Sequence, residues 1–218
     1  MPTLSLPHLT HAPQAGPAAH PTLICLHGRG SHEGDLIDLA QFIAPHVQNR
    51  LLWISPRAPL TLMDGYEWYR LLAYGVPEPA SFRAAQSTLD TFITEALAAY
   101  PIDPAQLFLL GFSQGSMMSY TFALEQPRRV AGVVAQSGYL PLNAGIHTDE
   151  AGVRDKPFLI THGTEDNVIP IAWAREAHAH LQTLHAAVEY HEFPNGHFLT
   201  EASLNVVARW LVEQIGEQ

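Results

Sequence analysis

Short unbroken apolar runs alternate along the chain with longer stretches in which apolar residues recur every three or four positions. An unbroken run of four to eight mainly apolar residues is typical of a strand that is covered on both faces, as in a parallel sheet. The runs that predict strands are Thr22–Leu26, Leu51–Ser55, Leu107–Leu110, Val130–Gln136, Phe158–Thr161 and Val188–Phe193.

Helical periodicity fills most of the intervals between these runs. The helical stretches include Leu36–Ile43, Ala85–Leu97, Met117–Leu124, Ala172–Leu184 and Leu204–Leu211. For the longest of these predicted helices, which contains Ala85–Leu97, Ser81 is the expected N-cap and Pro101 lies beyond the C-terminal end. Such alternation implies right-handed crossovers and a mostly parallel central sheet with helices on both faces. The sequence therefore predicts an α/β fold, and its 218 residues are expected to form one domain, 1–218.

Composition and charge narrow the choice of partners. The formal net charge of −10, with Lys156 as the only lysine, argues against nucleic acid and against an anionic membrane surface. The chain contains no apolar stretch long enough to span a bilayer, and its first residues do not resemble a secretory signal, so a cytoplasmic location is expected. Residues 7–21, rich in Pro, Ala and His, predict a surface loop. Cys25, inside an apolar run, is expected to be a buried hydrophobic residue.

The sequence Gly111-Phe112-Ser113-Gln114-Gly115 fits the pattern G-x-S-x-G at a predicted strand-to-helix junction. In α/β-hydrolases this tight turn is the nucleophile elbow, which raises a strained serine above the edge of the sheet. The pattern alone arises often by chance, but the flanking strand and helix support this interpretation. Ser113 is the candidate nucleophile.

A serine nucleophile requires a general base and an acid that orients it, and in this fold the chain order is Ser, Asp, His. Asp166 follows the predicted strand Phe158–Thr161, and His197 follows the predicted strand Val188–Phe193. Both therefore fall at the strand ends where ligands bind in parallel sheets. Three other residues compete for these roles, namely His162, His191 and Glu165; their positions fit less well.

An oxyanion hole needs two backbone N–H groups. One donor is expected from Gln114, which follows the nucleophile, and the other from Arg29 in the glycine-rich turn His27-Gly28-Arg29-Gly30 after the first core strand. The N-terminal end of the helix after Ser113 would add the positive end of its dipole.

These motifs together resemble the phospholipase/carboxylesterase family of α/β-hydrolases, which includes acyl-protein thioesterases and small bacterial esterases. The segments that carry the resemblance are His27–Gly30, Ser55–Pro59, Gly111–Gly115, His162–Pro170 and Gly196-His197. The resemblance implies a Ser113–Asp166–His197 triad, oxyanion donors at Arg29 and Gln114, no metal and no organic cofactor. Arg29 stands where acyl-protein thioesterases usually carry an apolar residue, and Phe198 and Leu199 also depart from the usual pattern; these differences concern specificity.

The long connection between Ser55 and Ser81 contains many apolar and aromatic residues, and such loops are usually functional. It either forms a wall for a hydrophobic substrate or covers a sheet edge. The candidate pocket residues are Tyr66, Trp68, Leu71 and Phe198. The segment 138–156, where larger relatives insert a lid, predicts only loop, so no lid domain is expected.

The function that these residues favour is hydrolysis of a carboxylic ester, or of a thioester, through an acyl-enzyme on Ser113. The expected partner is a small-molecule substrate, without nucleic acid or stable membrane insertion, for a monomer or homodimer. Two alternatives stay open at this point: a non-catalytic ligand-binding protein of the same fold, and transfer of the acyl group to an acceptor other than water.

Overall fold

The computed structural model describes residues 2–13 and 18–216 and is built around a seven-stranded sheet. The strand order is β1-β3-β2-β8-β9-β10-β11, and every neighbouring pair is parallel except β1 with β3. The strands are β1 (His8–His11), β2 (His20–Leu26), β3 (Leu52–Pro56), β8 (Ile102–Phe112), β9 (Gly132–Gln136), β10 (Pro157–Gly163) and β11 (Ala187–Phe193). All six predicted strands are confirmed, and the α/β prediction with them.

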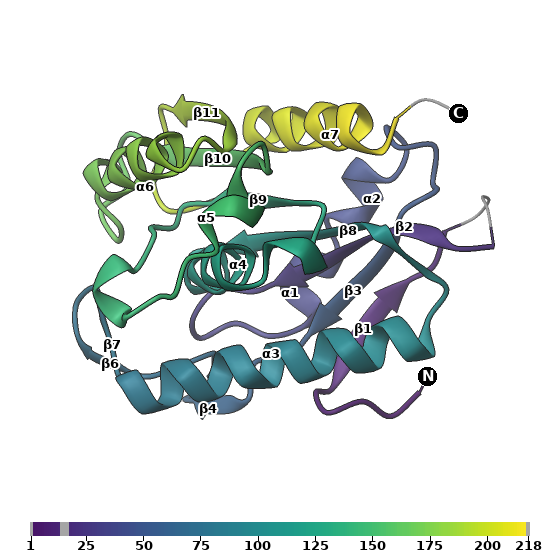
Figure 1. Cartoon of the computed structure of the whole chain (residues 1–218), viewed down its shortest axis with the longest axis horizontal. Coiled ribbons are helices and arrows are strands. Elements are labelled where there is room, and N and C mark those ends of the chain that lie inside the picture. The colour runs from purple at the N-terminus through teal and green to yellow at the C-terminus, as the bar shows by residue number, and fades with distance from the viewer. Residues whose placement is uncertain (1, 14–17, 217–218) are drawn as a thin grey trace.

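Helices cover both faces of this sheet (Figure 1). They are α1 (Gly34–Ile37), α2 (Ala40–Ile43), α3 (Pro79–Ala99), α4 (Gln114–Glu125), α5 (Glu150–Val153), α6 (Ile171–Thr183) and α7 (Glu201–Ile215). Because side chains alternate along a strand, Leu23 and Cys25 of β2 pack towards α1, α2 and α7, whereas Ile24 and Leu26 pack towards α3, α4 and α6. Cys25 is fully buried, as expected, and this burial raises the pKa of its thiol.

Three local predictions are wrong. The loop expected over residues 7–21 contains β1, which pairs antiparallel with β3; residues 14–17 lie outside the described residues. The stripe expected as one helix over Leu36–Ile43 forms the two short helices α1 and α2. Helix α3 begins earlier than expected, because Pro79 fits its first position. The N-cap is Glu78 and not Ser81: the carboxylate of Glu78 accepts from the amides of Ala80 (3.0 Å) and Ser81 (2.8 Å).

The long connection between β3 and α3 folds into two hairpins. Strands β4 (Leu60–Leu62) and β5 (Gly65–Glu67) form the first, and β6 (Leu71–Ala73) and β7 (Val76–Pro77) form the second. The segment 138–156 contains only a 3₁₀ turn at Leu142–Ala144 and the short α5, which leaves no room for a lid domain.

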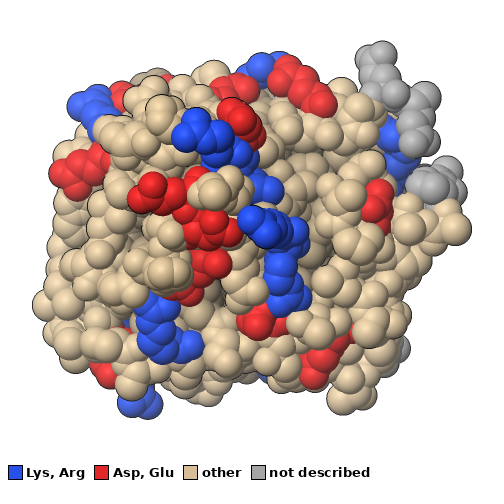
Figure 2. Space-filling model, in the orientation of Figure 1, with Lys and Arg blue, Asp and Glu red and all other residues tan. Residues whose placement is uncertain are grey.

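Charged side chains of both signs lie side by side on the face shown in Figure 2, without an extended patch of one sign. None of the helices within residues 2–13 and 18–216 combines the length and the hydropathy needed to cross a membrane.

Candidate active site

Ser113 occupies a strained turn between β8 and α4. Its backbone angles, φ 52° and ψ −119°, lie in a region that side-chain-bearing residues rarely adopt. Its amide donates to the carbonyl of Gln136 at the end of β9 (2.9 Å). The turn packs so closely that a Cβ on Gly115 would overlap the carbonyl oxygen of Leu26, which explains why this position requires glycine.

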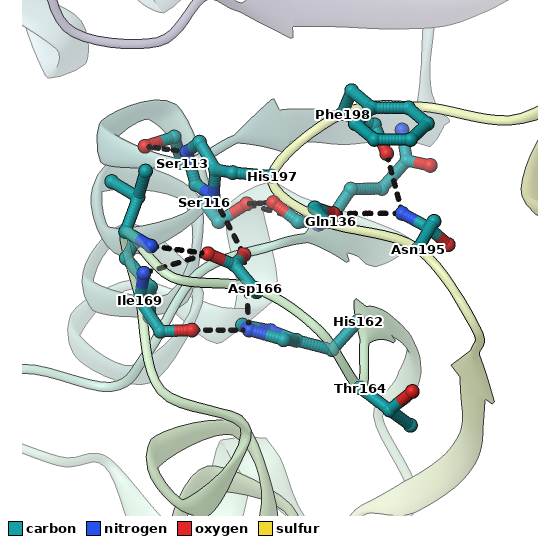
Figure 3. Close-up of polar contacts among 12 residues, drawn as sticks. Ser113, Ser116, Gln136, His162, Thr164, Asp166, Ile169, Asn195, His197 and Phe198 are labelled. Carbon is teal, nitrogen blue, oxygen red and sulfur yellow. Dashed lines mark hydrogen bonds and ion pairs between the residues drawn. The ribbon is translucent and has the colours of Figure 1, made fainter.

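Three strand ends bring Ser113, His197 and Asp166 together (Figure 3). The Oγ of Ser113 lies 3.0 Å from Nε2 of His197, which belongs to the loop after β11. The Nδ1 of the same ring lies 2.7 Å from Oδ2 of Asp166, which belongs to the loop after β10. These distances join hydroxyl, imidazole and carboxylate in one hydrogen-bonded chain.

Asp166 is held by its own loop. Its side chain is fully buried, and Oδ1 accepts from the amides of Val168 and Ile169, each at 2.8 Å. These two bonds fix the carboxylate, and its Oδ2 is directed at His197.

His162, one of the competing histidines, contacts this carboxylate from the other side. Its Nε2 donates to the carbonyl of Ile169 (2.9 Å) and lies 3.3 Å from Oδ2 of Asp166. Burial lowers the pKa of His162, which keeps the ring neutral at neutral pH. His162 therefore supports the loop that carries Asp166, and no hydrogen bond links it to Ser113.

The other two competitors lie apart from this chain of hydrogen bonds. Glu165 is exposed, and its backbone N–H donates a hydrogen bond to the carbonyl of Asn195 (3.0 Å). His191 pairs with Glu189 at 2.6 Å on the edge strand β11.

The turn after β2 packs against the elbow, because a Cβ on Gly28, the residue before Arg29, would lie 3.4 Å from the Cβ of Ser113. The ring of His27 fixes this turn, because its Nδ1 donates to the carbonyl of Gly28 (2.8 Å) while Nε2 accepts from the amide of Ala58 (3.0 Å). Burial lowers the pKa of His27, which favours this neutral arrangement. Within the described residues, neither the N–H of Arg29 nor that of Gln114 donates to a protein acceptor, so both are available to a ligand.

The side chain of Gln114 has a role that the sequence did not indicate. Its Oε1 accepts from the amide of Trp68 (2.7 Å), and its Nε2 donates to the carbonyl of Tyr69 (2.7 Å). The residue after the nucleophile thus ties the long connection to α4. The sequence indicates only that an amide side chain follows Ser113. It does not identify the partners of that amide, because they are backbone groups.

A cavity of about 320 Å³ opens beside Ser113. The candidate triad residues Ser113 and His197, together with Gln114 and Arg29, lie on its wall. The rest of the wall is apolar or aromatic, and is formed by Tyr69, Leu71, Tyr74, Gly75, Met117, Tyr139, Val168, Ile169 and Trp173.

Of the four predicted pocket residues, only Leu71 lies on this wall. Trp68 is completely buried behind it, where its indole N–H donates to the carbonyl of His27 (2.9 Å). The ring of Tyr66 packs against the guanidinium of Arg57, whose Cζ lies 4.6 Å from the centre of the ring. Phe198 is more than half exposed and lies beside a separate, small hollow near Asn195. Tyr66 and Trp68 therefore support the turn of Arg29, whereas Tyr69 and Tyr74 are the aromatic residues of the connection that line the cavity.

Comparison with known proteins agrees with this architecture. The model of the Phospholipase/Carboxylesterase family matches residues 12–215. "Acyl-protein thioesterase 1" of Schizosaccharomyces pombe is 31% identical, over 68% of this chain and 70% of the relative, and "Acyl-protein thioesterase 1 homolog 1" of Dictyostelium discoideum is 28% identical, over 82% and 80%.

Two solved structures have the same fold. The Bacillus cereus carboxylesterase superimposes with a TM-score of 0.85 at 22% identity, covering 96% of this chain and 94% of that one. Esterase PE8 gives a TM-score of 0.80 at 29% identity, covering 96% and 98%. The chain is a hydrolase of the esterase kind and belongs to the phospholipase/carboxylesterase family of α/β-hydrolases.

Proposed function

We propose that this protein is a serine hydrolase of carboxylic esters or thioesters in which Ser113 is the nucleophile, His197 the general base and acid, and Asp166 the group that orients His197. The observation that carries the proposal is the continuous hydrogen-bonded chain from Ser113 Oγ through His197 to Asp166. A complete, connected triad favours catalysis over non-catalytic ligand binding.

The acylation half of the reaction uses each of these groups. As Oγ of Ser113 bonds to the carbonyl carbon of the substrate, Nε2 of His197 takes the hydroxyl proton. The carbon–oxygen or carbon–sulfur bond of the substrate then breaks, and the leaving alcohol or thiol takes that proton from His197. Asp166 keeps the Nδ1 proton in place and stabilises the transient imidazolium.

Water completes the cycle. It attacks the acyl carbon as His197 accepts one of its protons, and that proton returns to Ser113 when the acyl bond breaks. The products are a carboxylic acid and the alcohol or thiol, and the enzyme is regenerated.

The negative charge on the carbonyl oxygen is assigned to the amides of Arg29 and Gln114. Gln114 is the first residue of α4, so the positive end of that helix faces the same point. Loss of one such donor typically reduces the rate by about 10²–10³. The apolar wall fits a small-molecule ester with a hydrophobic part, and the cytoplasmic location, the single domain and the oligomeric state stay predictions.

The test is hydrolysis of p-nitrophenyl esters of increasing acyl length by the native enzyme and by Ser113→Ala. The matched control is Ser87→Ala, which removes an exposed hydroxyl from α3. We expect Ser113→Ala to lose turnover and the control to retain it, and a fluorophosphonate to label native protein on Ser113 alone. Turnover that persists in Ser113→Ala, or a native protein inactive on every ester, would overturn the proposal.

A further inference from the structure

The cavity beside Ser113 contains one permanent charge in an otherwise apolar and aromatic wall. Among the described residues that line it, only Arg29 carries a fixed charge. Its side chain is 43% exposed, and Arg29 is one of the residues that line the cavity. A cationic side chain in a mainly apolar wall indicates that the cavity binds a polar or anionic group, because an apolar substrate would be bound better by an apolar side chain at this position.

The partner of Arg29 leaves most of the guanidinium unused. Its Nε donates to Oε2 of Glu67 on β5 (2.8 Å), and the Glu67 side chain is only 7% exposed. No other described group accepts from Arg29, so Nη1 and Nη2 have no protein partner. By contrast, Arg57 in the same region donates to Glu33 through both Nε and Nη2.

Glu67 also fixes where the guanidinium lies. Strand β5 is joined to the turn of Arg29 by backbone bonds from Gly30 to Tyr66 (2.7 Å) and from Tyr66 to Ser31 (2.8 Å). The buried carboxylate therefore lies on a strand that is bonded to the same turn, and it holds Arg29 by one nitrogen. Glu67 therefore orients the guanidinium of Arg29 and leaves its remaining N–H groups free to bind a ligand.

We propose that Arg29 is a specificity-determining residue that binds a carboxylate on the acyl part of the substrate, so that the enzyme prefers half-esters of dicarboxylic acids. The inference rests on the proposed ester hydrolysis. The free Nη groups form a planar pair of donors that matches a carboxylate. A dianionic phosphate fits less well, because the carboxylate of Glu67 would repel its second charge.

The position of Arg29 also limits the length of the substrate. Its own amide is the proposed oxyanion donor, so the guanidinium reaches only as far from the ester carbonyl as one arginine side chain extends. A short dicarboxylic acid, such as succinic or glutaric acid, spans that separation, whereas a long one would place its carboxylate beyond the guanidinium.

The first test compares kcat/KM for mono-p-nitrophenyl glutarate with kcat/KM for p-nitrophenyl hexanoate, a neutral ester of similar length. The readout is the ratio of the two values, because substitution at Arg29 also touches the oxyanion turn. We expect Arg29→Leu to lower this ratio by about 10-fold or more, as the loss of a charge-assisted pair requires. Arg57→Leu, which removes an equal charge outside the cavity, is expected to change the ratio less than about twofold.

A second test does not depend on turnover. Calorimetry on Ser113→Ala is expected to show that glutarate binds more tightly than hexanoate, and that adding Arg29→Leu removes the difference. If neutral esters are hydrolysed but Arg29→Leu leaves both the ratio and the binding preference unchanged, the inference fails while the proposed function stands. If the native enzyme hydrolyses neither ester, the proposed function fails, and the binding experiment alone decides the role of Arg29.

Discussion

The carboxyl ends of the parallel strands and the connection between β3 and α3 meet at the same cavity, yet they are built differently. At the strand ends, Ser113 and Asp166 are buried. The amide of Ser113 donates to the carbonyl of Gln136 on the neighbouring strand, and the carboxylate of Asp166 accepts from two amides of its own loop. In the connection, Leu72 and Tyr74 at the tip of the second hairpin are exposed, at 66% and 61%. The proposed reacting groups thus lie at the ends of buried strands, whereas part of the cavity wall, including Leu71 and Tyr74, lies on a more exposed segment.

The largest effect should come from a change at the strand ends. In Asp166→Asn, Oδ1 can still accept from the amides of Val168 and Ile169, so the loop is retained. The new amide group, however, would donate to Nδ1 of His197 and leave the proton on Nε2, where it cannot accept from Ser113. We expect kcat to fall by about 10⁴ with little change in the melting temperature.

The neighbouring acid provides the matched control. Glu165→Gln changes an exposed side chain next to Asp166 in the same loop, and its kcat should stay within about twofold of the native value. A comparable loss of activity in both variants would mean that the loop as a whole, and not the Asp166 carboxylate, limits the reaction.

The strand ends were predictable because the rules that shape them are local. The apolar runs before Ser113, Asp166 and His197 predict strands, and parallel strands deliver the residues that follow them to one edge of the sheet. The turn at Ser113 can be recognised in the sequence because its close packing requires glycine at positions 111 and 115.

A second comparison concerns glycines in the two regions. In Gly115→Ala the new methyl group would overlap the carbonyl of Leu26 inside the core, whereas in Gly65→Ala it would overlap the carbonyl of Gly30 in the turn beside the hairpin. The buried sheet cannot shift as easily as a hairpin, so we expect a loss of unfolding free energy above about 3 kcal/mol for Gly115→Ala and a smaller loss for Gly65→Ala.

Urea unfolding measures both losses, and ester hydrolysis should distinguish them further. The Gly65 variant is expected to stay folded but lose activity, because displacement of Gly30 also displaces the amide of Arg29. Equal destabilisation of the two variants would contradict the difference in rigidity between the two regions.

The connection could not be predicted in the same way, because its contacts are between residues distant in sequence. Trp68 was expected near the substrate, but its backbone amide bonds to Gln114 and its indole bonds to the carbonyl of His27, so it is buried. A large aromatic residue satisfies the hydrophobic pattern equally well on a pocket wall or behind it. Only the packed structure separates the two outcomes.

Acidification should weaken both regions through buried neutral histidines. Burial lowers the pKa of His27 and of His162 below the ordinary 6.5, so the unfolded chain binds more protons than the folded one as the pH falls below that value. Their contribution to stability is complete above pH 6.5 and is lost as the pH falls towards their folded pKa values. Each histidine adds a slope of up to about 1.4 kcal/mol per pH unit.

Urea unfolding between pH 7.5 and pH 5 measures this slope. Carboxylates such as Glu33 and Glu192, whose pKa values are lowered from 4.5 by arginine partners, lose their contribution mainly below that window. His27→Gln and His162→Gln are each expected to be less stable at pH 7.5 but to have a shallower slope. A native protein whose stability is constant across the window would contradict the neutral state assigned to both rings.

The smallest effect is expected at the wall of the cavity. Leu71→Ala removes apolar surface from the lining, and Leu72→Ala removes the same group from an adjacent residue that is more exposed and does not line the cavity. Because Leu71 is itself 36% exposed, its truncation should lower kcat/KM for medium-chain p-nitrophenyl esters by only about two- to fivefold, and shift the optimum to longer acyl chains that fill the added space. The Leu72 variant should keep the native optimum. If both variants shift it equally, the whole hairpin, and not one side of it, contacts the acyl chain, and the boundary between wall and surface lies further out than the cavity indicates.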